Sequence, residues 1–388
     1  MHTSFIASAF ALAAAVSAAP LTKRWDYSKY FDLEGHRGAR GEAIESTLPA
    51  FGQAIIHGAT TLELDFGVTK DGHAIVWHDE SIQADKCLDT APAFENDPLF
   101  PYVGRYVNTL TLEQIKTLDC GSLRLDGFPL QYLVPGQKIS TLDELFDFVD
   151  CATANPILYN IESKINAENE TLTFRPAEFM DVFLPILQAR GKEFVDRITH
   201  QSFAWESIIV SKERLPSLRT SALCDDTTIW PYPEGETSGN LTVHGQGPAP
   251  WLNGLDIDTF EGETVGERVA RAAASVGADV LSPVATSYAS ESPDPALPGW
   301  IPFTNKTMVD TARSLGLETR PWTPNYLNLI EYLISEAGVS GLITDFPENV
   351  RRYLINEHPE LPLAPKQDPK PVKQCLAKHN QRHNVTSA

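Results

Sequence analysis

The chain has 388 residues and a formal net charge of −20, from 51 acidic and 31 basic residues. A surface this acidic argues against general nucleic-acid binding, which needs a basic footprint, and it disfavours anionic membrane surfaces. An anionic substrate would therefore need a locally positive pocket, for which a metal ion is the expected source.

The first residues have the pattern of a secretion signal. The segment from Phe5 to Ala19 is small and apolar, and it ends in a small-residue cleavage site. The dibasic Lys23-Arg24 that follows resembles a processing site, so we predict a signal peptide and short pro-segment over residues 1–24. We expect a secreted protein, extracellular or in the cell wall. No later segment is long and apolar enough to span a bilayer, so stable membrane insertion is not expected.

From Leu33 onward, short apolar strands alternate with amphipathic helices over most of the chain. The predicted strands cover, in chain order, 33–37, 60–68, 74–77, 157–161, 197–203, 218–223, 254–257, 279–283, 318–322 and 341–345. Two predicted helices begin after an N-cap at Ser46 and at a capping box at Thr141. Four more are predicted over 204–214, 265–276, 308–315 and 327–337. Such alternation is typical of parallel strands covered by helices. About eight βα units favour a closed (β/α)8 TIM barrel over an open sheet.

Two segments interrupt this alternation. Residues 80–137 and 224–251 contain many Pro and Gly residues and are too long for simple loops. We predict that both are insertions on the active-site side of the barrel. The barrel domain is expected over residues 25–356, and a polar tail over 357–388 is expected to wrap the surface or to be disordered.

In a secreted protein the sequons can be glycosylated and the cysteines can form disulfides. Four sequons offer glycosylation acceptors at Asn169, Asn240, Asn305 and Asn384. The five cysteines form no Cys-x-x-Cys pattern, so we expect no structural zinc and one or two disulfides, with at least one thiol left over. We favour the pair Cys87 and Cys120, because both flank one inserted region.

Two pairs of polar side chains stand on predicted strands. Glu63 and Asp65 alternate with apolar residues, so both acids point the same way, and in a barrel that direction is the interior. Two acids there would need a metal or strong partners; the alternative is a strand turned so that both face water. Glu162 and Lys164 repeat the spacing on a later strand, where a surface ion pair is an equally good explanation.

Two histidines stand at strand ends. His36 precedes Arg37, and His78 precedes Asp79. A lone histidine at such a place is more often structural. Two of them, with an arginine and two sets of carboxylates, favour a site, because the C-terminal strand ends of a barrel meet on one face. Carboxylates that hold a divalent cation, cations that neutralise phosphate and imidazoles that move protons together suit phosphodiester cleavage.

These motifs resemble those of the glycerophosphodiester phosphodiesterase family over roughly residues 32–352. The family's His-Arg-Gly, Glu-x-Asp, Thr-Lys-Asp-Gly, His-Asp and Glu-x-Lys motifs resemble residues 36–38, 63–65, 69–72, 78–79 and 162–164. Later segments at 201–203, 322–325 and 341–345 are also similar to the family's. The sequence departs from the family at Ile44-Glu45-Ser46-Thr47, where the family has Pro-Glu-Asn-Thr.

The resemblance implies a TIM barrel and a phosphoric diester hydrolase that releases sn-glycerol 3-phosphate and an alcohol. It implies a divalent cation, Ca²⁺ or Mg²⁺, bound by Glu63, Asp65 and Glu162. It makes His36 and His78 the general acid and base. The residues implied to contact phosphate or substrate are Arg37, Lys164, Glu45 and Trp322.

Two alternatives stay open. One is a phospholipase D-like lyase of the same superfamily, which stops at a cyclic phosphate. The other is an inactive secreted barrel that serves as a binding module. The expected partner is a small-molecule glycerophosphodiester, with the head group and the oligomeric state left open.

Overall fold

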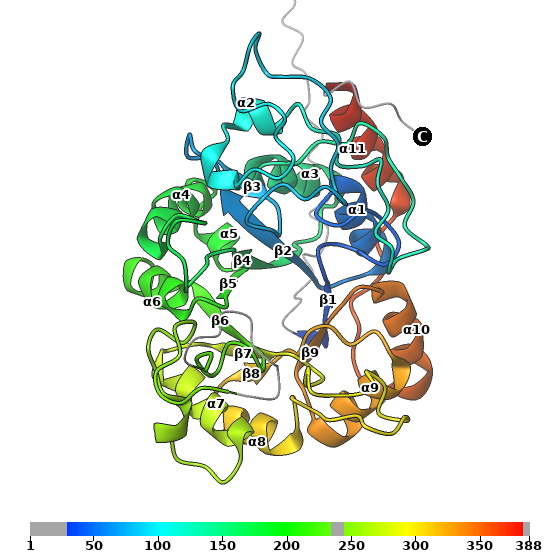
Figure 1. Ribbon diagram of the computed structural model, residues 1–388. Coiled ribbons are helices and arrows are strands. Elements are labelled where there is room, and N and C mark those ends of the chain that lie inside the picture. The colour runs from blue at the N-terminus through cyan, green and yellow to red at the C-terminus, as the bar shows by residue number, and fades with distance from the viewer. Residues whose placement is uncertain (1–28, 234–243, 383–388) are drawn as a thin grey trace, which may run out of the picture.

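A computed structural model describes residues 29–233 and 244–382. Eight parallel strands surround the axis of a nearly closed barrel, with helices outside them (Figure 1), so the predicted TIM barrel is confirmed. The strands are β1 (Asp32–Gly35), β2 (Thr61–Val68), β4 (Leu158–Ser163), β5 (Ile198–Ser202), β6 (Arg219–Cys224), β7 (Val280–Pro283), β8 (Glu318–Thr319) and β9 (Gly341–Thr344). They pair in the order β8-β7-β6-β5-β4-β2-β1-β9, and a bridge between Trp322 and Ile343 connects the two ends.

The outer helices follow from local capping signals. Thr141 and Thr264 each form a capping box with the Glu three residues later, and Gly58 ends the first helix in a left-handed conformation. The helices are α1 (Leu48–His57), α2 (Leu112–Ile115), α3 (Leu142–Ala152), α4 (Pro176–Ala189), α5 (Lys192–Val195), α6 (Trp205–Arg214), α7 (Val265–Ser275), α8 (Lys306–Ser314), α9 (Leu327–Glu331), α10 (Pro347–Glu357) and α11 (Pro369–Arg382). A π-helical turn over Tyr332–Ala337 continues α9, and short 3₁₀ turns cover Val107–Thr109 and Ile257–Thr259.

Two local predictions were wrong, and one predicted strand differs in its pairing. The N-cap of α1 is Thr47, because Ser46 has a φ of 58° and lies outside the helix. The strand predicted over 74–77 is present as β3 (Ala74–Val76), but it pairs antiparallel with β2, since the turn between them is too short for a crossover. Residues 254–257 form no strand, and the 3₁₀ turn Ile257–Thr259 follows Asp256, whose side chain caps it.

Strand β2 has the two faces that its alternation predicts. Leu62, Leu64 and Phe66 are fully buried in the layer between the sheet and the outer helices. Phe66, for example, stacks on Phe183 of α4 with 4.8 Å between ring centroids. The intervening side chains must then point into the barrel.

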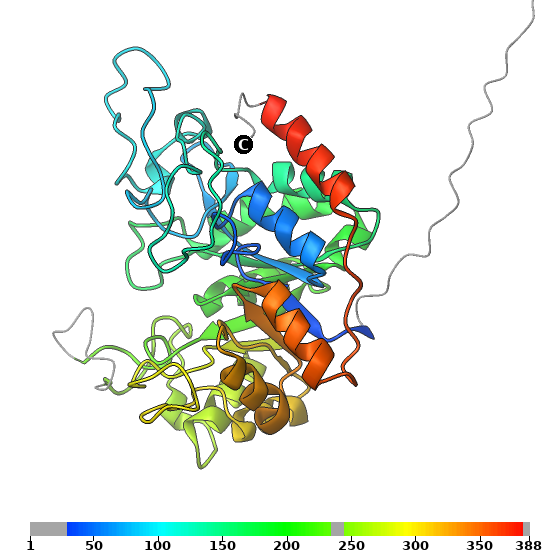
Figure 2. The same cartoon turned by 90° about the vertical axis from the view of Figure 1, so that its right-hand side faces the viewer.

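The insertion over residues 80–137 has a small core of its own. Tyr102, Leu110 and Ile115 are buried in it, and the disulfide between Cys87 and Cys120 confirms the favoured pairing. In Figure 2 this insertion and the segment after β6 both project from the same end of the barrel. The predicted position of the insertions on one face is therefore correct.

The described part of the C-terminal tail wraps the outside of the barrel. Helix α11 packs against α1 and α3, with Val372 fully buried. A second disulfide, between Cys151 of α3 and Cys375 of α11, fixes this contact, and Cys224 is left as a buried thiol. Among the described helices, none has the length and apolar character needed to cross a membrane.

Candidate active site

The predicted site residues come together at the C-terminal ends of the strands. His36 follows β1, Glu63 and Asp65 lie on β2, and Glu162 ends β4 just before Lys164. His78 reaches the same place by the hairpin, because β3 runs back along β2 and the Trp77 N–H donates to the Asp65 carbonyl. A cavity of about 390 Å³ is lined by His36, Arg37, Glu63, His78, Glu162 and Lys164, among others.

Three carboxylates form the floor of this site. Glu63, Asp65 and Glu162 are all buried, and each offers an oxygen within 4.8 Å of the other two. Glu63 is held by the Arg37 backbone N–H at 2.9 Å and by the Gln201 amide at 2.8 Å. Within the described part of the chain, Asp65 Oδ2 accepts no hydrogen bond.

The charges of this cluster are only partly balanced. Burial, with the neighbouring Asp65 charge, raises the pKa of Glu63 well above its ordinary value. Burial also raises the pKa of Glu162 to about 7, against the opposing charge of Lys164. Three close oxygen ligands, a carboxylate oxygen without a hydrogen bond and excess negative charge fit a hard divalent cation.

His36 is oriented by a carboxylate. Its Nδ1–H donates to Asp345 Oδ1 at 2.6 Å, and its Nε2 lies 4.0 Å from Glu63 Oε2. The Asn325 amide donates to the other Asp345 oxygen at 2.6 Å. Burial is the largest influence on the His36 pKa and lowers it, so the neutral ring is favoured. The neutral ring then presents an unprotonated Nε2 toward the carboxylates.

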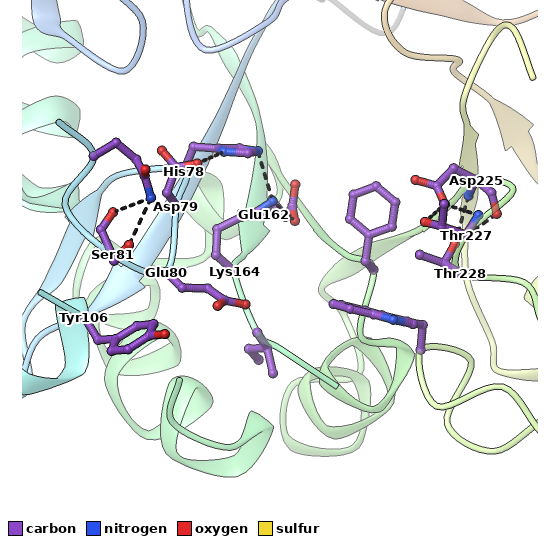
Figure 3. Close-up of a pocket in the computed structure, with 14 residues that line it drawn as sticks. His78, Asp79, Glu80, Ser81, Tyr106, Glu162, Lys164, Asp225, Thr227 and Thr228 are labelled. Carbon is purple, nitrogen blue, oxygen red and sulfur yellow. Dashed lines mark hydrogen bonds and ion pairs between the residues drawn. The ribbon is translucent and has the colours of Figure 1, made fainter. Parts of the chain in front are cut away.

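His78 shows the same arrangement (Figure 3). Its Nδ1 lies 3.0 Å from Asp79 Oδ1, and its Nε2 lies 3.2 Å from the Lys164 ammonium. Because an ammonium can only donate, Nε2 must accept and the proton must sit on Nδ1. Burial and the charge of Lys164 hold the pKa of His78 well below its usual range. Lys164 in turn lies 2.7 Å from Glu162 Oε1.

Glu45 stands behind the arginine rather than in the cavity. Arg37 Nη1 donates to it at 3.1 Å, Lys86 Nζ lies 2.8 Å away, and Arg40 forms a further short contact. These three cations hold the pKa of Glu45 well below its usual range even though it is buried. Glu45 thus fixes Arg37, whose guanidinium also lies 3.5 Å from Asp65.

The comparisons with known proteins agree with this geometry. The sequence profile of the glycerophosphoryl diester phosphodiesterase family matches residues 36–349. The chain belongs to this family.

Similar proteins are distant in sequence. A glycerophosphodiester phosphodiesterase of Caldanaerobacter subterraneus is 26% identical over 315 residues, which are 81% of this chain and 94% of the relative. A solved structure from Silicibacter pomeroyi has a TM-score of 0.63 at 24% identity, covering 87% of this chain and 96% of the other. An Oleispira antarctica phosphodiesterase, solved in complex with the product sn-glycerol-3-phosphate, has a TM-score of 0.55 at 16% identity, with coverages of 85% and 98%. These structures share the fold of this family member.

The remaining predicted residue of the site is aromatic. Trp322 lines the same cavity in this member of the family, and its indole N–H donates to the Ser282 carbonyl at 3.0 Å. Its ring meets Phe203 almost at a right angle, with 5.4 Å between centroids. The two rings form an apolar part of the cavity wall.

Several residues of the site were missed from the sequence as site residues. Asp345, Gln201 and Arg40 contact the predicted residues through side-chain atoms, and Asn325 contacts Asp345. Asp345, Gln201 and Asn325 lie in segments that resemble family motifs, so the motifs themselves were the available signal. Arg40 lies beside the divergent 44–47 segment, and no motif in the sequence indicated its role.

The sequons fall in different surroundings. Asn169 is exposed, whereas Asn305 is half-buried and caps α8 by accepting from the Met308 N–H. Asn240 and Asn384 lie outside the described residues. The predicted signal peptide and pro-segment over residues 1–24 lie outside them as well.

Proposed function

We propose that this protein hydrolyses glycerophosphodiesters to sn-glycerol 3-phosphate and a free alcohol, with His36 and His78 as the proton-transfer groups. One observation carries the proposal. Two imidazoles, each held at Nδ1 by a carboxylate, face a cavity that two cationic side chains also border, together with Glu63 and Glu162 of the three-carboxylate cluster. This is the orientation that general acid–base catalysis requires of a histidine.

The carboxylates Glu63, Asp65 and Glu162 would hold a divalent cation, Ca²⁺ or Mg²⁺. When bound, such a cation supplies positive charge to a phosphate oxygen and makes a nearby glycerol hydroxyl more acidic.

The other cations would bind the phosphate. Arg37 and Lys164 both border the cavity, and each forms an ion pair with an acid, Arg37 with Glu45 and Lys164 with Glu162. Arginine offers a planar fork of donors and lysine a compact charge, which together suit a phosphodiester. Trp322 and Phe203 would form an apolar part of the wall and keep bulk water away from the reacting atoms.

The proton transfers then follow from the two Nε2 atoms. One imidazole accepts the proton of the glycerol 2-hydroxyl while that oxygen bonds to phosphorus. The other imidazole, whose protonated form the anionic diester would favour, donates to the alcohol oxygen as its bond to phosphorus breaks. In the second step the roles are exchanged: a water oxygen bonds to phosphorus, its proton is accepted, and the cyclic phosphate opens by protonation of the 2-oxygen.

The direct test is product analysis with several diesters. The full chain is incubated with glycerophosphocholine and with glycerophosphoglycerol, with Ca²⁺ or Mg²⁺ and with EDTA, and phosphorus NMR follows the products. We expect sn-glycerol 3-phosphate, its loss with EDTA, and a His78→Gln variant with kcat lower by roughly 10²–10⁴. A reaction that stops at the cyclic phosphate would identify a lyase. If neither diester is cleaved with either cation, the barrel is a binding module.

We also propose that the protein is secreted. The apolar segment before residue 24, the sequons and the two disulfides, Cys87–Cys120 and Cys151–Cys375, support this. The full chain expressed in a secreting host should reach the medium and begin near Trp25 by N-terminal sequencing. A chain that stays inside the cell with an intact N-terminus would contradict the proposal.

A further inference from the structure

We propose that a second cavity beside the catalytic one binds the alcohol part of the substrate and selects a cationic head group of the choline or ethanolamine type. This inference rests on the proposed function and names its substrate class. The second cavity has a volume of about 480 Å³ and shares His78, Glu162, Lys164, Phe203 and Asp225 with the catalytic cavity. A diester whose phosphate lies at the shared residues can therefore extend into it.

The two walls of this cavity come from the two insertions (Figure 3). Glu80 and Tyr106 belong to the first insertion and lie on one side. Asp225 and Thr227, which follow β6, lie on the other. The walls that differ from the catalytic cavity thus come from insertions rather than from barrel strands, and loops of this kind can vary to select a leaving group.

Two acidic side chains of the cavity, Glu80 and Asp225, are not balanced by cations. Glu80 accepts from the Asn166 amide at 2.7 Å and, among the residues that the structure describes, makes no ion pair. Asp225 is 5% exposed and in the same residues has no cationic partner either. Its Oδ1 accepts from the Thr227 N–H at 2.8 Å and hydroxyl at 2.7 Å, which fixes its direction. Burial raises the pKa of the Asp225 carboxyl, and a bound cation would favour its charged form.

An anionic head group would find little support here. Of the described residues that line the cavity, Lys164 is the one lysine or arginine, and its ammonium is held by Glu162 at 2.7 Å. A serine head group would bring its carboxylate close to Glu80 and Asp225, where like charges repel.

Three hydroxyl groups of the walls already form hydrogen bonds within the protein. The Thr227 hydroxyl donates to Asp225, and Thr228 bonds to the Asp225 backbone. The Ser81 hydroxyl accepts from the Gln83 amide at 2.9 Å. Glycerol or inositol would have to compete with these contacts.

The aromatic residues complete the case for a cation. Phe203 and Trp251 meet at 81° with 6.5 Å between centroids, and Tyr106 stands on the opposite wall. The ammonium of Lys164 already lies 5.7 Å from the centroid of Phe203. Aromatic faces combined with carboxylates are the surroundings that bind quaternary ammonium groups.

The experiment compares two alcohols in the same full-length enzyme. The ratio of kcat/KM for glycerophosphocholine over glycerophosphoglycerol is measured with the cation that supports activity. We expect a ratio of about ten or more in the wild type, and a roughly tenfold fall in Asp225→Asn and in Glu80→Gln, the size of one cation contact. Both substitutions keep one side-chain oxygen, which can still accept from Thr227 at position 225 and from Asn166 at position 80. Asp85→Asn, which removes the same charge from an exposed place in the first insertion, is the matched control and should keep the wild-type ratio.

Free choline provides a test that needs no variant. We expect it to inhibit the wild type at a lower concentration than glycerol does. Equal cleavage of the two diesters, or an unchanged ratio in both folded variants, would overturn the inference while the proposed function stands. If neither diester is cleaved, the proposed function fails and this inference fails with it.

Discussion

The substitution Asp345→Asn tests how His36 is held. In the native site Asn325 accepts the Asp345 backbone N–H and the Thr344 hydroxyl with its oxygen, each at 3.1 Å, so its NH₂ must face Asp345. An amide at position 345 must therefore turn its own oxygen toward Asn325. Its NH₂ then faces His36 Nδ1, which has to become an acceptor.

This reversal moves the His36 proton to Nε2. A neutral ring with Nε2–H cannot accept a proton there, and as a proton donor it is far weaker than the imidazolium that the Asp345 carboxylate stabilises. His36 is thus disabled in either catalytic role. We expect kcat to fall by roughly 10²–10⁴, the range for losing a general acid or base or its correct tautomer. The substrate should bind almost as before, because Asp345 lines neither cavity.

The assay measures kcat and KM separately with glycerophosphocholine, with thermal unfolding to confirm the fold. We expect the loss in kcat, with KM within about threefold of the wild type. A variant that keeps half of its kcat, or one whose loss lies wholly in KM, would refute this role of Asp345.

Three other predictions concern the metal site, the barrel interior and the tail. Glu162→Gln removes one of the three proposed cation ligands, so half-maximal activity should need at least about tenfold more Ca²⁺ or Mg²⁺; an unchanged titration would contradict the ligand assignment. Burial and the charge of Asp32 raise the pKa of Glu34 to about 8, although the charge of Arg320 acts in the opposite direction. Between about pH 4.5 and 8, Glu34 is therefore protonated in the native state and ionised in the unfolded chain. Wild-type stability should thus fall as the pH rises through this window, by up to a few kcal/mol, whereas Glu34→Gln should flatten the curve in urea unfolding; parallel curves would argue against it. Replacing both Cys151 and Cys375 by Ser opens a disulfide between residues 224 apart and should cost about 2–5 kcal/mol in urea unfolding. Activity at 25 °C should persist, because this disulfide joins two outer helices. A variant that loses its activity but unfolds at the same urea concentration as the wild type would contradict this expectation.

Much of the fold was predictable because its signals are local. The period-two pattern of β2 predicted which side chains point inward, and the capping box at Thr141 predicted where α3 begins. The orientation of β3 was missed since a short apolar segment does not reveal which neighbour it pairs with. That error mattered for the site, because the antiparallel hairpin is what returns His78 to Asp65.

The candidate site was predictable where its residues form motifs, and not where they meet only through the fold. Gln201, Asn325 and Asp345 lie in segments that resemble family motifs, but the motifs do not indicate which side chains these residues contact. Their contacts with Glu63, Asp345 and His36 join residues 138, 20 and 309 positions apart. The pairing of Cys151 with Cys375 likewise depends on where α11 packs.

By itself, then, the sequence determined the residue types of the chemistry and the strands that present them, because alternation and strand-end placement are properties of a few neighbouring residues. Tertiary structure alone decided the hydrogen-bonded state of each histidine and the shape of the cavity beside them. Closing the barrel brings β1 next to β9 and so puts Asp345 against His36, and packing sets the two insertions opposite each other. Those contacts depend on distances between segments far apart in the chain, which local pattern does not contain.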